Sequence, residues 1–168
     1  MLGLEIHEAA STGDYDSLEE FVKSGKFDLN HGDEDWSNKT PLHWACQKGY
    51  VECVRLLLEH GAKGTARTET GWTPAHFAAE AGKVTALRAL NSAGVPVNKR
   101  DAYGCTPRRI AEIYNQQECC KFLIQVETEQ EERRAKLSLD GLESDEEEDE
   151  WESRTSRSLL DRTSTYRS

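Results

Sequence analysis

The sequence lacks any run of 18 apolar residues, and only 36% of its 168 residues are hydrophobic. A helix needs about 20 mainly apolar residues to cross a bilayer, so we expect no membrane span. The first ten residues also lack a basic segment followed by a long apolar core, and they carry Glu5 and Glu8. They therefore do not resemble a secretory signal peptide.

Cysteines are few and are not paired in the sequence. There are five, an odd number, and no two are spaced as C-x-x-C. Disulfide frameworks use even numbers of cysteines and zinc sites use closely spaced pairs, so we expect no disulfide framework, no metal and no other cofactor. Because thiols stay reduced in the cytosol and nucleus, we expect the protein in the cytoplasm, the nucleus or both. The five are Cys46, Cys53, Cys105, Cys119 and Cys120.

Positive charge is scarce, most of all in the C-terminal quarter. The chain has 21 Lys and Arg against 31 Asp and Glu, a net charge of −10. Residues 1–126 hold 14 basic and 17 acidic residues, whereas residues 127–168 hold 7 and 14. Such an acidic segment disfavours direct binding to nucleic acid or to anionic membranes. We expect basic protein surfaces as partners instead.

Catalytic patterns are also missing from the sequence. It has no glycine-rich phosphate loop, no metal-ligand spacing and no pattern that places a nucleophile beside a base and its orienting group. The sequence therefore predicts a protein that is not an enzyme.

What the sequence does contain is a period of 33 residues. Four kinds of residue keep this interval, so chance is a poor explanation. A weaker copy lies upstream at an offset of 36, and its three additional residues fit a loop at 33–35. The repeated features are Thr40-Pro41, Thr73-Pro74 and Thr106-Pro107, the histidines His43 and His76, the glycines Gly49 and Gly82 with Asn115, and Gly61 with Gly94; the upstream copy has His7, Gly13 and Gly25.

Each unit predicts a pair of short helices. Thr40 is a good N-cap, and Pro41 suits the first helical position, so a helix is expected over 41–48. Gly49 supplies a left-handed turn, and a second helix follows over 51–60. The next unit repeats the pattern over 74–81 and 84–93. One such pair cannot bury its apolar face alone, whereas four stacked copies can.

Each unit resembles the ankyrin repeat, whose pattern is roughly D-x-x-G-x-T-P-L-H-x-A-A-x-x-G. The match lies at 35–49, 71–79 and 101–107, and 56–62 fits the end of the second helix. The resemblance covers about residues 2–126. It implies an all-α repeat solenoid, an ankyrin-repeat stack of four helix pairs with short β-hairpin fingers. It also implies that His43 and His76 tie one loop to the next. The expected repeats are 2–34, 35–67, 68–100 and 101–126.

The two end repeats depart from the pattern. Repeat one lacks Thr-Pro, and repeat four has Arg108 and Arg109 where Leu-His is usual. Both departures fit end caps, which need one polar outer face. The alternative is that the arginines bind a partner.

The resemblance also implies a concave surface, made of the fingertips and the first-helix faces, that binds a protein. Exposed Trp and Tyr are enriched at interface hot spots. The alternative for Trp36 and Trp72 is that they pack on neighbouring fingers; Trp44 and Phe77 are expected to fill the space between repeats. The candidate partner-binding residues are Trp36, Lys39, Glu69, Thr70, Trp72 and Tyr103 on the fingers, and Gln47, Lys48, Glu80 and Tyr114 on the helices.

A long helix over 117–137 is expected to follow the last turn, with 127–137 extending beyond the repeats. Residues 138–168 are rich in Ser, Asp, Glu and Arg and cannot bury enough apolar surface to fold. They predict a disordered acidic tail. Its sequence resembles kinase sites at Ser144, Ser156 and Ser158; a plain solubilising tail is the alternative. We also hypothesise that Trp151 and the acidic block before it fold back on the concave face.

One further modification is implied by the resemblance alone. Some ankyrin repeats are hydroxylated on the Asn that closes the loop after the second helix. That position is Asn98 here, with Leu90 eight residues earlier, and Asn30 in repeat one.

The sequence thus predicts a monomeric adaptor or scaffold that recognises a protein by its concave surface, without nucleic acid or membrane. Two alternatives remain open. One is a regulatory or inhibitory subunit of an enzyme, and the other is a nuclear co-regulator that uses the acidic tail.

Overall fold

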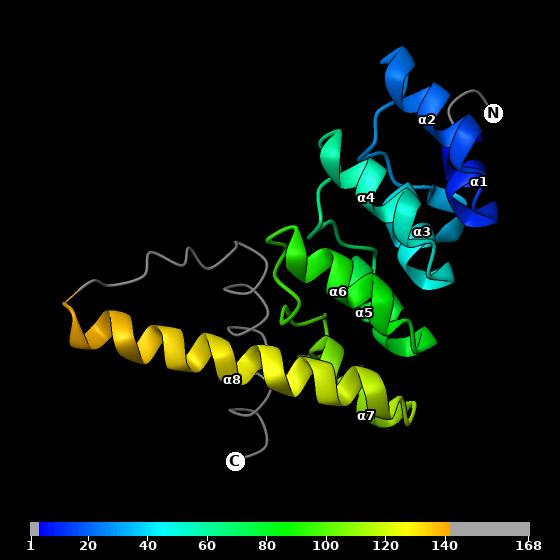
Figure 1. Ribbon diagram of the computed structural model, residues 1–168. Coiled ribbons are helices and arrows are strands. Elements are labelled where there is room, and N and C mark those ends of the chain that lie inside the picture. Colours follow the sequence, from blue (N-terminus) through cyan, green and yellow to red (C-terminus); the bar gives the residue numbers. More distant parts are fainter. Residues whose placement is uncertain (1–3, 142–168) are drawn as a thin grey trace, which may run out of the picture.

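The computed structural model describes residues 4–141, which fold into four stacked helix pairs (Figure 1). The first helices of the pairs pack on one another in the order α1, α3, α5, α7, and the second helices pack in the order α2, α4, α6, α8. The elements are α1 (Glu5–Thr12), α2 (Tyr15–Ser24), the 3-10 turn η1 (Glu34–Trp36), α3 (Pro41–Lys48), α4 (Val51–Glu59), α5 (Pro74–Ala81), α6 (Val84–Ser92), α7 (Pro107–Ile113) and α8 (Gln117–Leu139).

The all-helical repeat stack predicted from the 33-residue period is confirmed. Helices α3 and α5 have the expected bounds, and α4 and α6 each end one residue before the expected position. Asn115 takes the place of a turn glycine with φ 57°. A single apolar core runs from Ile6 in α1 to Val126 in α8, so each pair buries its apolar face against its neighbours.

The fingers between the pairs are shorter than regular hairpins. Each closes with one backbone bond, from Asp33 N–H to the Lys39 carbonyl at 2.9 Å, from Thr68 N–H to Trp72 at 3.0 Å, and from Asp101 N–H to Cys105 at 2.9 Å. Only the first pair forms a β-bridge, and residues 4–141 contain no β-strand. Turn bonds inside the fingers, such as Gly71 N–H to the Thr68 carbonyl at 2.9 Å and Gly104 N–H to the Asp101 carbonyl at 3.1 Å, add to these closing bonds without forming a ladder.

A repeated contact covers the turn glycines, and the sequence pattern did not reveal it. The side chain that follows each turn lies over the glycine of the preceding repeat: Tyr50 over Gly13, Lys83 over Gly49 and Gln116 over Gly82. Gln116 Nε2 also donates to the Glu80 carbonyl at 2.9 Å. The glycines therefore supply both a left-handed backbone and the room that the next repeat needs.

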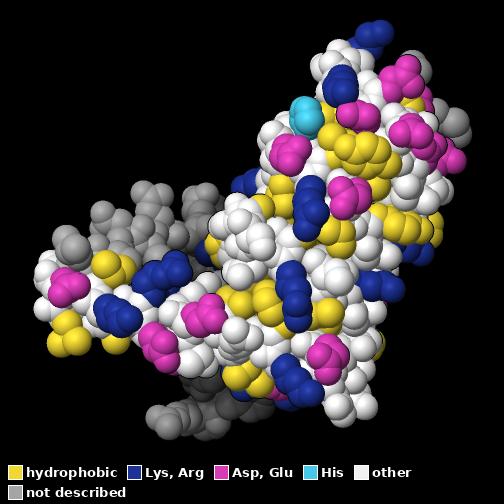
Figure 2. All heavy atoms as spheres, viewed as in Figure 1, with side chains coloured by type: hydrophobic (Ala, Val, Ile, Leu, Met, Phe, Trp, Pro, Cys, Tyr) yellow, Lys and Arg dark blue, Asp and Glu magenta, His cyan; other side chains and the backbone are white. Residues whose placement is uncertain are grey.

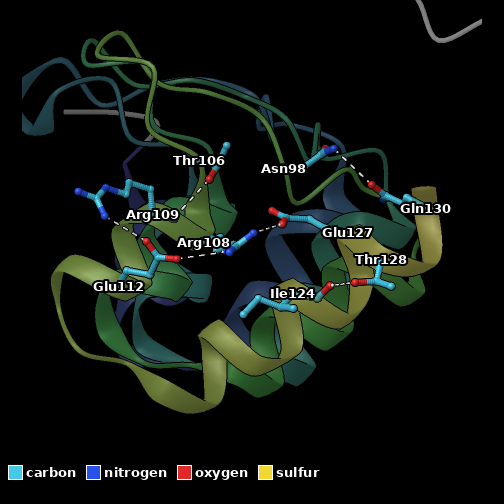
Figure 3. Close-up of polar contacts among 9 residues, drawn as sticks. All are labelled: Asn98, Thr106, Arg108, Arg109, Glu112, Ile124, Glu127, Thr128 and Gln130. Carbon is cyan, nitrogen blue, oxygen red and sulfur yellow. Dashed lines mark hydrogen bonds and ion pairs between the residues drawn. The ribbon is translucent and has the colours of Figure 1, made fainter. Parts of the chain in front are cut away.

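The C-terminal end of the stack is closed by ion pairs (Figure 3). The position that holds fully buried Cys46 and Ala79 in the preceding repeats holds exposed Glu112 in α7. Arg108 contacts Glu112 at 3.2 Å and Glu127 of α8 at 2.8 Å, and Arg109 contacts Glu112 at 3.1 Å. These charges are satisfied within the last repeat, which favours the end-cap interpretation of the arginines.

Helix α8 ends at Leu139, two residues beyond the expected 137 and inside the segment expected to be disordered from 138. Gly141, with φ 71°, accepts the left-handed conformation that terminates the helix. Beyond Val126 most side chains of α8 are exposed, and in Figure 1 the helix runs past the stack. The phosphorylation sites expected at Ser144, Ser156 and Ser158, and the Trp151 hypothesis, lie outside the described residues.

The turn geometry yields a stability prediction for Gly82→Ala. A Cβ there would lie 2.5 Å from Gln116 Oε1 on a backbone with φ 73°. We expect the left-handed strain and the displaced Gln116 together to lower the free energy of unfolding by about 2 to 3 kcal/mol, measured by urea denaturation.

Gly94→Ala is the matched control in the same repeat. It has φ 80°, but a Cβ there meets nothing within 4 Å, so it should lose only about 1 kcal/mol from backbone strain. Equal losses in the two variants would show that Gln116 does not press on Gly82.

Candidate functional site

Buried histidines tie α3 and α5 to the finger of the next repeat. Thr40 N–H donates to Nδ1 of His43 at 3.0 Å, and Thr73 N–H donates to Nδ1 of His76 at 3.1 Å. Nδ1 is therefore the acceptor, and Nε2 carries the proton. His43 Nε2 then donates to the Trp72 carbonyl at 2.9 Å, and His76 Nε2 donates to the Cys105 carbonyl at 2.8 Å. The tie that the resemblance implied for these histidines is present.

These histidines are neutral at physiological pH. Burial lowers the pKa of His43 and that of His76 to about 4, although the carbonyl bonds partly oppose the shift. Protonation would place a charge in the core and remove the acceptor that Thr40 and Thr73 need. The two rings are structural, because the Thr40 and Thr73 hydroxyls that also lie 2.8 Å from their Nδ1 atoms are buried together with them.

The fingers also bind one another side by side. Glu69 N–H donates to the Ser37 carbonyl at 3.0 Å, and Ala102 N–H donates to the Thr70 carbonyl at 3.0 Å. The two bonds are equivalent, one repeat apart. Together with the histidine ties they fix the three fingers relative to the helices.

A groove of about 440 Å³ opens between the fingers and the first helices of repeats two to four. Phe77 of α5 and Ile110 of α7 form its apolar base, and both are more than 90% buried. Tyr103 stands on its rim with 74% of its surface exposed. The other lining residues are Ser37, Lys39, Thr68, Thr70, Trp72, Asp101 and Cys105.

Trp72 both supports the groove and lines it. Its indole Nε1 donates to Asp101 Oδ2 at 2.9 Å, its ring stacks on His76 at 5.9 Å, and it contacts the edge of Phe77 at 5.0 Å. Asp101 Oδ1 in turn accepts from the backbone N–H of Tyr103 at 2.9 Å and of Cys105 at 2.8 Å. One tryptophan thus orders the next finger, as the packing interpretation expected, and keeps a half-buried face in the groove.

Lys39 has its contacts inside the domain. Its ammonium lies 4.3 Å from the centre of the Trp44 ring and 4.6 Å from that of Phe77, and it donates to Gln47 Oε1 at 3.0 Å. Burial lowers the pKa of Lys39, since the groove wall shields it from water. Trp36, 58% exposed, contacts the edge of Trp44 at 5.6 Å.

The ten residues expected to bind a partner fall into three groups. Lys39, Thr70, Trp72 and Tyr103 line the groove. Beside it, Gln47 bonds Lys39, and the charges of Lys48 and Glu80 act on Lys39. The remaining three are exposed and do not line the groove: Trp36, Glu69 and Tyr114. Whether any of the ten contacts a partner stays a prediction.

Sequence reasoning missed part of the groove. It assigned Phe77 to the space between repeats, and Phe77 does pack there, but its ring also forms the groove base. Ile110 occupies the equivalent position one repeat later and was not singled out. The 33-residue spacing of Trp44, Phe77 and Ile110 was the available signal.

Asn98, the expected hydroxylation site, follows α6 and is half-buried. Its side-chain Nδ2 donates to Gln130 Oε1 of α8 at 3.3 Å (Figure 3). This bond holds the Asn98 side chain against α8. The modification stays a prediction.

Residues 4–141 contain neither a membrane span nor a metal cluster. Within this range no helix is both long and apolar enough to cross a membrane. The same residues contain no group of three His, Cys, Asp or Glu side chains placed to hold a metal ion. On the face drawn in Figure 2, lysines and arginines alternate with acidic side chains along the stack rather than gathering in one patch.

The fold and the groove define a helical-repeat protein of the kind that binds other proteins. The sequence pattern described as ankyrin repeats (3 copies) matches residues 6–68 and 63–134. The chain belongs to the ankyrin-repeat family, whose repeats generally mediate protein–protein interaction and are generally not enzymes.

Three relatives show how much of each chain is similar. Human ankyrin repeat domain-containing protein 7 is 39% identical over 59 residues, and the human DNA-binding protein RFXANK is 44% identical over 59; each match covers 35% of this chain and 22% of the relative. The rat 26S proteasome non-ATPase regulatory subunit 10 is 34% identical over 69 residues, 41% of this chain and 29% of the relative. The chain therefore spans less than a third of each of these relatives.

The neutral histidines yield a pH prediction. In the unfolded chain a histidine has a pKa near 6.5, whereas His43 and His76 have a pKa of about 4 in the fold. The unfolded state therefore binds more protons below pH 6.5. The free energy of unfolding should be fully retained above pH 6.5 and should fall by about 3 kcal/mol per ring as pH drops toward 4.

Two measurements check this dependence. NMR titration of the ring protons should give midpoints near 4 for His43 and His76, and urea denaturation across the same range should show the loss. A midpoint near 6.5 for either buried ring would contradict the tie described above.

The dual role of Trp72 yields a second prediction. Trp72→Phe removes the donor to Asp101, a charge-assisted bond, and should lower the free energy of unfolding by about 1 to 3 kcal/mol. Trp36→Phe is the matched control and should change it by less than about 0.5 kcal/mol, since Trp36 is exposed. Thermal or urea denaturation measures both, and equal effects would refute the structural role of the indole N–H.

Proposed function

We propose that this protein is an adaptor or scaffold that binds a partner protein in the groove of repeats two to four and does not itself catalyse a reaction. The observation that supports this most directly is the groove itself. Its base is apolar, and Tyr103 stands exposed on its rim. Large exposed aromatic side chains beside an apolar pocket are typical of binding hot spots.

The rigidity of the fingers favours this use. The histidine ties, the finger-to-finger bonds and the Trp72–Asp101 bond hold the groove walls in place before any partner arrives. A preformed surface loses little conformational entropy on binding. Binding can therefore draw its free energy from a few well-placed contacts.

Two alternatives keep some support from the relatives. The 26S proteasome non-ATPase regulatory subunit 10 bears a regulatory subunit's name, and RFXANK is named as a DNA-binding protein. Each similarity covers less than half of this chain. These similarities concern the surface that contacts a partner. A regulatory or nuclear co-regulatory role for this chain would also involve the tail. The tail, with Ser144, Ser156 and Ser158, lies outside the described residues.

Several finer features complete the proposal. The five cysteines are free thiols, which supports a reducing compartment, the cytoplasm or the nucleus. We propose a monomer, because the ion-paired cap closes the C-terminal end of the stack. The segment 72–82 resembles ankyrin repeat domain-containing protein 66, and we propose a closer relationship with that protein.

The test compares partner capture by the wild type and by Tyr103→Ala. Quantitative affinity purification from native tissue should identify a protein retained by the wild type and lost with the variant, and purified partner should bind the variant at least about tenfold more weakly. The unfolding free energy should stay within about 0.5 kcal/mol, since the ring is 74% exposed.

Tyr15→Ala is the matched control, because Tyr15 is a partly exposed tyrosine of α2, away from the groove. It should leave partner binding unchanged. Equal capture by the wild type and Tyr103→Ala, confirmed with the purified partner, would rule out the groove as the binding site.

A further inference from the structure

We infer that the groove takes a partner segment that carries one large apolar side chain and, close beside it, a lysine or arginine. The apolar side chain enters between Trp72 and Tyr103, and the cation pairs with Glu80. This inference rests on the proposed function and adds the chemistry of the partner.

The apolar half of the site lies on repeats three and four. Phe77 and Ile110 form the base, Trp72 and Tyr103 form two sides, and none of these four side chains carries a charge. The polar lining comprises hydroxyls, such as that of Thr70, and the charged groups of Lys39 and Asp101, which already have partners within the domain. A Leu, Met or aromatic side chain fits such a lining, whereas a charged one would be desolvated without a partner.

Glu80 supplies the polar half. It lies on α5 one turn after Phe77, so both side chains project from the same face of the helix. Its carboxylate is half-buried and makes no hydrogen bond or ion pair with any described residue. Burial raises the pKa of Glu80, and the charge of Lys39 only partly offsets this. A half-buried carboxylate without a hydrogen-bond partner is stabilised by a cation that a partner supplies.

The fold already shows that this surface holds a cation. The Lys39 ammonium lies over the faces of Trp44 and Phe77 and is bonded to Gln47. Lys39 is therefore held by the two rings and by Gln47. The Glu80 carboxylate has no such contacts with the described residues, and the nearby positive charge of Lys39 faces the rings. Ring faces are negative and attract lysine and arginine. A partner's cation would meet the same rings and would compete with Lys39.

Other negative charges in and around the groove also favour a positively charged partner segment. Glu69 stands exposed at a fingertip beside the groove, and the carboxylate of Asp101, although bonded within the domain, lies in the groove lining. The chain as a whole carries −10, and a field of this sign speeds encounter with basic partners. Lys39 and exposed Lys48 act in the opposite direction, so an acidic partner segment is the competing outcome of the test.

The test begins with a library of random 12-residue peptides displayed on phage and selected on the full-length protein. Peptides that pair an aromatic or long aliphatic residue with a nearby Lys or Arg should be enriched. A selected peptide is then synthesised with a fluorophore, and its dissociation constant is measured by anisotropy at low and physiological salt. Binding should weaken as salt rises.

Two charge-neutralising variants give opposite results if the inference holds. Glu80→Gln should weaken the peptide about fivefold, since it loses its ion pair. Lys39→Gln should tighten it by about threefold or more, because the internal competitor is removed. Glu20→Gln and Lys26→Gln make the same charge changes at exposed positions of repeat one and should leave binding within about twofold.

The remaining outcomes separate this inference from the proposed function. Enrichment of acidic peptides, or weaker binding to Lys39→Gln, would overturn the inference while leaving the groove as the site. Binding that Glu80→Gln leaves unchanged but Tyr103→Ala abolishes would do the same. Peptide binding that survives Tyr103→Ala, or a selection that enriches nothing, would count against both the inference and a groove that takes a linear segment.

Discussion

The structure depends on a bond that joins each of the first helices α3 and α5 to the finger of the next repeat. In two successive repeats a buried imidazole accepts a hydrogen bond from the backbone N–H of its own N-cap residue and donates one to a finger carbonyl, at Trp72 and then at Cys105. The bond fixes the finger and positions Trp72 over His76. Without it, the groove would have no fixed outer wall. The fold and the binding surface therefore share one buried polar interaction, which requires a neutral ring.

Most of the fold could be predicted from the sequence because its signals are local. The Thr-Pro pairs and the turn glycines mark where each short helix begins and ends. Their 33-residue spacing predicts how the helices stack. The covering of Gly82 by Gln116 could not be predicted, since it joins different repeats through side chains without a shared residue type. The end of α8 was misplaced by two residues because Gly141 was not considered as a terminator.

The site was predictable in outline but not in its contacts. Carrying the family pattern onto the chain identified the finger side, and with it Trp72 and Tyr103. It could not tell that Trp72 would bond Asp101, because this contact spans 29 residues and depends on how two fingers lie together. The placement of Lys39 over Phe77 is likewise a tertiary contact, made between repeats that the sequence treats as separate units.

The ion-paired end of the stack limits how long a segment the groove can hold. With Glu112 in place of Cys46 and Ala79, and Arg108-Arg109 in place of Leu-His, another repeat would have to stack on charged side chains. Neighbouring helices lie about 10 Å apart, so three fingers span roughly 20 Å, the length of about six residues of extended chain. A short footprint of that kind suits a linear motif that is exchanged readily among partners, whereas a large and permanent interface would need a longer stack.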